Sequence, residues 1–154
     1  MIVRSLSMMT IAMCLSLSAH AAPSINDISG CQATLAFIAE KANSLEAKYG
    51  ATDVETVSAA LSTYGAFLQA AHMAPGLSAL NGGDVAKTDA MQVQIDQYQN
   101  TLKDALAKKY SQPRLFSDHA VMVNNCYAIA PMDEGHTAMM KTALATLIEM
   151  AKQD

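Results

Sequence analysis

The chain carries little positive charge. Lys and Arg make up ten of its 154 residues, against fourteen Asp and Glu. Nine of the basic residues follow residue 21, where they do not cluster and where Arg114 is the single arginine. Proteins that bind nucleic acid neutralise its phosphates with clustered Lys and Arg. The composition therefore predicts no nucleic-acid partner, and it equally disfavours an acidic membrane surface.

Long apolar runs are also scarce. The most apolar run, from Ser5 to Ser18, has no charged residue; Arg4 precedes it and Ala19-His20-Ala21 follows it. A positive start, a short apolar run and small residues before the cut are typical of a cleaved signal peptide. The run is too short to remain as a membrane-spanning helix. We therefore predict a signal peptide over residues 1–21 and no stable membrane insertion after processing.

Cysteine is rare, and its placement is informative. Of the three cysteines, Cys14 lies in the predicted signal peptide, so the mature domain, residues 22–154, keeps Cys31 and Cys126. Two cysteines in a chain bound for an oxidising compartment usually pair. Closing a loop of roughly ninety residues contributes about 4–5 kcal/mol in the chain-entropy model. We predict a Cys31–Cys126 disulfide in a periplasmic or secreted protein.

No segment of the mature chain alternates apolar and polar residues with the period of a strand. Apolar residues instead recur at steps of three and four, in segments separated by Gly and Pro, as in helices. A capping box between Thr52 and Glu55 is expected to start the second segment. The predicted helices cover about 26–49, 53–72, 84–110 and 113–129, and a fifth begins after Pro131.

Short connections between these helices predict antiparallel neighbours. The predicted fold is all-α, an antiparallel up-down helical bundle of four to five helices, with the first four forming the bundle and the fifth packed across it. In that arrangement the start of the first helix and the end of the fourth lie at the same end. Cys31 and Cys126 are then at similar depths, so the topology and the predicted disulfide support each other.

Catalytic motifs are missing from the chain. It has no Gly-x-Ser-x-Gly elbow and no zinc-protease His-Glu-x-x-His. Ser117-Asp118-His119 are adjacent on a predicted helix, so their side chains point in different directions. The Asn81–Asp84 segment has no Lys and no preceding strand, which indicates a tight turn instead of a phosphate loop. We predict that the protein is not an enzyme and has no cofactor.

A metal site is the main alternative. His119 and Met122 share a helix face with Cys126, and His136 and Met140 add side chains that suit copper. Methionine also fills irregular cores, however, and the disulfide would use Cys126. The chain has no Cys-x-x-Cys-His motif, through which haem is attached covalently. We favour no metal site, and keep a small-ligand or metal (copper or haem) carrier that uses the bundle interior as the alternative function.

Two features suit recognition of another protein. The predicted loop 74–83 carries two leucines beside glycines, and apolar loop side chains either tuck inward or meet a partner. A run of uncharged amides around a tyrosine follows, and amides can bond without desolvation of a charge. The candidate partner-binding residues are Leu77, Leu80, Gln92, Gln94, Gln97, Tyr98 and Gln99.

The leading hypothesis is therefore an exported, non-enzymatic protein-binding domain of the inhibitor or immunity type. Small exported helical proteins with one disulfide include such proteins, but that likeness is one of architecture only and transfers no residues. The structure can separate the two functions. A carrier should have a cavity with inward His and Met ligands, whereas a protein binder should have a filled core and an apolar surface patch.

Overall fold

The computed structural model describes residues 22–153, and all regular structure within that range is helical. The elements are α1 (Ile25–Asn43), α2 (Glu46–Tyr49), α3 (Ala51–Leu68), the π-helix η1 (Gln69–Met73), α4 (Ala74–Leu80), α5 (Val85–Lys109), α6 (Ser117–Ile129) and α7 (Glu134–Lys152). The predicted all-α class is confirmed. The predicted signal peptide, residues 1–21, lies outside the described residues. Across those residues, no helix combines the length and apolar character that a membrane crossing requires.

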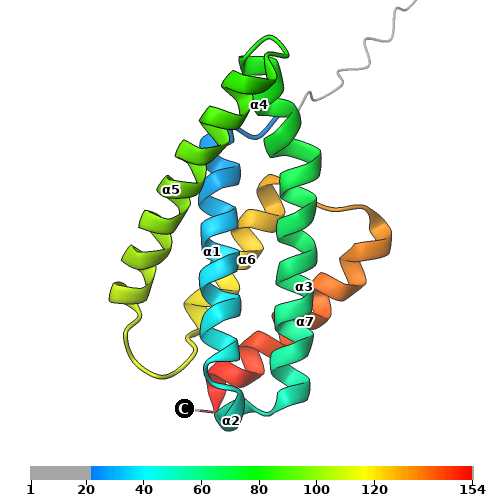
Figure 1. Cartoon of the computed structure of the whole chain (residues 1–154). Helices are drawn as coiled ribbons and strands as arrows, with labels where there is room; N and C mark the ends of the chain where they lie inside the picture. Colours follow the sequence, from blue (N-terminus) through cyan, green and yellow to red (C-terminus); the bar gives the residue numbers. More distant parts are fainter. Residues whose placement is uncertain (1–21, 154) are drawn as a thin grey trace, which may run out of the picture.

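The antiparallel helices α1 and α3 form the centre of the bundle (Figure 1). α6 packs on α1, and α7 packs on both α3 and α6. The core between them is apolar, and its fully buried side chains include Ile28, Ile38, Tyr64, Leu68, Met140 and Leu147. Burial of such side chains stabilises the fold by about 1.5–3 kcal/mol each, which makes this the main stabilising contribution. The prediction of a helical bundle is confirmed.

α7 contributes buried side chains to the core, whereas α5 does not. α5 contributes no buried residue. α7 buries Met140, Leu147 and Met150, together with Ala143. Of the four helices predicted to form the bundle, α5 therefore packs along α1 without adding a buried residue, and α7 supplies the fourth set of buried side chains. The inward face of α5 is interrupted by the amides of Gln92 and Gln99 and is buried only in part, whereas α7 presents a continuous apolar stripe to α3.

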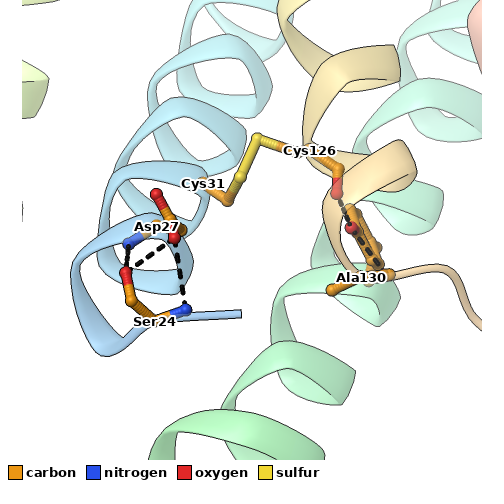
Figure 2. Close-up of a disulfide and its surroundings, with 6 residues drawn as sticks. Ser24, Asp27, Cys31, Cys126 and Ala130 are labelled. Atoms are coloured by element: carbon orange, nitrogen blue, oxygen red, sulfur yellow. Dashed lines mark hydrogen bonds between the residues drawn. A yellow bond between two sulfur atoms is a disulfide. The ribbon is translucent and has the colours of Figure 1, made fainter. Parts of the chain in front are cut away.

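The first predicted helix, 26–49, is broken in two. α1 starts with a capping box: the hydroxyl of Ser24 accepts a hydrogen bond from the amide of Asp27, whose carboxylate accepts from the amide of Ser24 (Figure 2). α1 ends at Asn43, and α2 then runs to Gly50, whose φ of 89° stops the helix. No side chain caps α3, so the predicted capping box of Thr52 and Glu55 is wrong.

The segment predicted as the loop 74–83 is mostly helical. α3 continues through η1 into α4, and Pro75 stands in the first turn of α4. In a regular α-helix the ring of a proline clashes with the carbonyl four residues earlier, and the wider π-turn just before Pro75 relieves that clash. The chain then reverses at Gly82 and Gly83, with φ of 61° and 79°. The predicted tight turn before the next helix is confirmed.

α6 begins at Ser117, four residues later than the predicted start near Pro113. The preceding connection is held in an irregular form by Lys41 of α1. Its ammonium group donates hydrogen bonds to the carbonyl oxygens of Tyr110 at 2.6 Å and Gln112 at 2.7 Å. These two carbonyls are therefore satisfied by a side chain and do not need a helix.

Candidate functional site

The disulfide predicted from the sequence is present. Cys31 of α1 and Cys126 of α6 are bonded, with their Cα atoms 5.5 Å apart (Figure 2). The hydroxyl of Tyr64 on α3 lies 2.7 Å from the carbonyl oxygen of Cys126 and 2.9 Å from that of Ala130, and it donates to both. The carbonyl of Cys126 also accepts from the amide of Ala130, whereas the last carbonyls of a helix, such as that of Ala130, have no partner within it, so this hydroxyl stabilises the end of α6. Burial raises the pKa of Tyr64, which keeps the hydroxyl protonated as a donor.

His119 is a core residue. Its side chain is 0% exposed, and the rings of Phe37, Tyr110 and Phe116 surround it with centroids 4.7–5.6 Å away. Nδ1 accepts a hydrogen bond from the amide of Phe116 at 3.4 Å, while Nε2 has no hydrogen-bond partner among the described residues. Burial, together with the nearby charge of Lys41, lowers the pKa of His119 to about 4. The imidazole is therefore neutral at pH 7.

The four residues of the alternative metal site do not converge. Met140 is fully buried in the core, and Met122 is half-buried against the core. His136 is exposed in the first turn of α7, where its Nδ1 lies 2.9 Å from a carboxylate oxygen of Asp133. His119 stands near the start of α6, whereas α7 and His136 follow its end. About 15 Å of helix, at 1.5 Å per residue, separate His119 from that end. Within residues 22–153, no three His, Cys, Asp or Glu side chains are grouped so as to hold a metal ion.

The two leucines of the predicted binding loop have different environments. Leu77 is 0% exposed, so the prediction that it contacts a partner is wrong. Because the segment is a helix, Leu77 falls on the same face as the buried Met73, four residues earlier. Leu80 lies on another face and is 67% exposed.

Two of the candidate glutamines are used inside the protein. The Nε2 amide of Gln99 donates to Gln32 at 2.9 Å, Gln32 donates to Gln69 at 3.0 Å, and Gln69 donates to Gln92 at 3.1 Å. This glutamine ladder, made of Gln99, Gln32, Gln69 and Gln92, joins α5 to α1 and η1. Sequence reasoning found Gln92 and Gln99 but missed their partners, because nothing local to α5 indicates that Gln32 and Gln69 lie opposite.

The other candidates on α5 are exposed. Gln94, Gln97 and Tyr98 lie away from α1, as does Val93. At the start of the same helix Val85 is 71% exposed. Uncharged amides, an aromatic ring and apolar side chains are therefore all accessible along α5.

Leu80 belongs to an apolar groove that the sequence did not reveal. The groove has a volume of about 710 Å³ and lies where the start of α1 meets α4 and α5. We call it the tip groove; its lining residues are Pro23, Ser24, Ile25, Asn26, Gly76, Ala79, Leu80, Met91 and Ile95. A Cβ on Gly76 would lie 2.5 Å from the Cδ1 of Ile25, so glycine lets this side chain lie close against α4.

A second apolar groove, of about 360 Å³, runs between α6 and α7. Its lining residues are Ser117, Ala120, Val121, Asn124, Leu144 and Ile148, and none of them is charged. Val121 is 56% exposed there. No protein-family model, curated protein or solved structure matches this chain.

Proposed function

We propose that the mature domain is an exported, non-enzymatic protein-binding module of the inhibitor or immunity type. The observation that supports this most directly is the contrast between interior and surface. Met73, Met140 and Met150 are fully buried among apolar side chains, so they fill the core. The grooves described above open at the surface and are lined mainly by apolar atoms. A filled core with apolar surface grooves is the arrangement expected of a protein binder.

The proposed contact surface is the tip groove with the adjoining exposed side of α5. Leu80 supplies an apolar side chain of the groove that is 67% exposed, and Val85, which is 71% exposed, stands at the start of α5. Protein interfaces typically have few charged residues at their centre, and aromatic residues such as Tyr98 are enriched there. Gln94 and Gln97 add amide groups that form hydrogen bonds without desolvation of a charge.

The proposed compartment is the periplasm or the exterior of the cell. The Cys31–Cys126 bond supports it, because disulfides persist in oxidising compartments. Removal of residues 1–21 during export belongs to the same proposal.

The test is capture of a partner from an extract of the compartment into which the protein is exported, with the mature protein as bait. Leu80→Asp places a charge in the tip groove and should abolish the capture that the wild-type protein gives. Ile148→Asp is the matched control, since Ile148 is also an exposed apolar residue but lies in the α6–α7 groove. Both variants should melt close to the wild type. Equal capture by the wild-type protein and Leu80→Asp would contradict the proposed surface.

A further inference from the structure

α5 is attached to the rest of the protein differently from the core helices. It is 25 residues long and contributes no buried residue. α1, α3, α6 and α7 each bury four residues or more. Along its length α5 packs on α1, and near its start also on α4. Since burial of apolar area is the main stabilising contribution, α5 is held less firmly than its neighbours.

The contacts of α5 with its neighbours combine partly buried apolar side chains with polar pairs. Two bonds of the glutamine ladder join α5 to α1 and η1, and Lys103 pairs with Glu40 at 2.8 Å. On α1, Ser29 and Ala33 share the face of Glu40 by helical spacing, so small side chains lie under α5. The hydroxyl of Ser29 is buried without a hydrogen-bond partner in residues 22–153. Separation of the two helices would expose the partly buried Met91, Ile95 and Leu106, but no fully buried side chain of α5, and it would let water reach the hydroxyl of Ser29.

Both ends of α5 are fixed. At its start the chain turns through Gly82 and Gly83, two residues in the left-handed region of backbone conformation. At its end Tyr110 is buried, and its carbonyl accepts a hydrogen bond from Lys41. α5 thus runs along one side of α1, between the turn after α4 and the connection before α6 (Figure 1), and contributes no buried residue.

The disulfide links the helices that precede α5 directly to those that follow it. α5 lies between the two cysteines in the sequence, but the Cys31–Cys126 bond joins α1 directly to α6 (Figure 2). These two helices also pack against each other. The helices before and after α5 therefore stay connected when α5 leaves its place.

We propose that α5 is a strap, a helix that opens as a separate unit while the bundle of α1, α3, α6 and α7 stays folded. Opening exposes the face of α1 that carries Ser29 and Ala33, which are buried in the closed structure. It also widens the groove of about 470 Å³ in which Leu102 and Leu106 of α5 lie over the disulfide. Local opening below the free energy of global unfolding is a known property of elements with few buried apolar contacts. The strap does not depend on the proposed partner.

Hydrogen exchange of the oxidised mature protein, followed by mass spectrometry at neutral pH, tests the proposal. Amides of residues 90–105 should exchange about ten-fold faster, or more, than amides in the centres of α1 and α3, because they exchange through an opening of lower free energy. They should also share one free energy of opening, as expected for a unit that opens together. Exchange of α5 as slow as that of α3 would mean that α5 opens only with the whole protein, and it would overturn the proposal.

A variant of the glutamine ladder gives a second test. Gln32→Ala removes the hydrogen bonds from Gln99 and to Gln69. Exchange in α5 should become about ten-fold faster again, the size expected for loss of net hydrogen bonding, while α3 and α7 are unchanged. Gln97→Ala, on the exposed side of α5, is the matched control and should alter neither. Equal acceleration in every helix, or no acceleration in α5, would each contradict the strap.

Discussion

The hydroxyl oxygen of Tyr49 accepts a hydrogen bond from the backbone amide of Leu115 at 2.8 Å, and both residues are buried although 66 residues separate them. The bond fixes the irregular connection before α6 against the corner between α2 and α3. Leu115 lies outside any helix, so its amide has no ladder of helical carbonyls to use.

Tyr49→Phe keeps the ring and removes this acceptor. We expect the free energy of unfolding to fall by about 1–3 kcal/mol, because a buried amide loses its partner. Urea unfolding followed by circular dichroism measures the change. Tyr98→Phe, in an exposed ring of α5, is the control and should change stability by less than about 0.5 kcal/mol. A Tyr49→Phe protein as stable as the wild type would show that the hydrogen bond contributes nothing.

Replacement of both Cys31 and Cys126 by serine should lower stability by roughly 2–5 kcal/mol, because the unfolded chain regains the freedom of a long loop. Denaturant unfolding of the wild-type and double-variant proteins gives the difference. Peptide maps with and without reductant provide the control, since a linked pair of peptides should appear only without reductant. A free thiol at either position in the exported wild-type protein would contradict the bond.

Acid should destabilise the protein through His119. The pKa of this residue is lowered from 6.5 to about 4 in the folded protein, so the unfolded state binds the proton first as the pH falls. The stability present above pH 6.5 is then lost progressively between pH 6.5 and 4, by up to about 1.4 kcal/mol per pH unit. Unfolding measured at several pH values in this window should show the decline.

His119→Phe is the control for the acid effect. Phenylalanine fits an aromatic environment and cannot be protonated, so the decline between pH 6.5 and 4.5 should flatten whatever the absolute stability of the variant. The pKa values of Asp27 and Asp133 are lowered below 3.8, chiefly by hydrogen bonds from Ser24 and His136 respectively. Their own contributions are therefore lost at lower pH. An unchanged slope in His119→Phe would remove His119 as the cause.

Export should remove residues 1–21. The intact mass of the protein recovered from the periplasm or the medium should correspond to a chain that starts at Ala22. Changing Ala21 to a bulky residue such as Phe should block the cut, because the peptidase accepts only small side chains there. A recovered protein that still contains Cys14 would show the interpretation of the N-terminal segment to be wrong.

The sequence was sufficient for the helices and for the disulfide, but not for the distribution of helices around the core. Three-four spacing identifies which residues share a face, as for Met140 and Leu147 of α7 or Met91 and Ile95 of α5. It does not decide which of two amphipathic helices is buried. That outcome depends on how the helices pack in three dimensions. α7 is buried more deeply than α5, and its apolar stripe is not interrupted by amides.

The candidate surface was predictable only where exposure follows from local pattern. Gln94 and Gln97 are exposed, and so is Tyr98, whose three-four spacing with Ile95 and Leu102 would equally have suited the inward face; Leu77 is buried because its segment is helical. The glutamine ladder depends on partners up to 67 residues apart, and the α6–α7 groove depends on the packing angle of two helices. Neither leaves a signal in a short stretch of sequence.

The Cys31–Cys126 bond turns residues 31–126 into a closed covalent ring, and α7 belongs to the tail that leaves it. A protease that cuts the exposed connection at Ser111–Pro113 would produce two pieces that remain joined, so the nicked molecule keeps α1 beside α6. A cut at the exposed Pro131 would instead release α7, the helix that carries Met140 and Leu147 of the core. Of the four core helices, α7 is therefore the one whose retention rests on packing and on a single stretch of backbone.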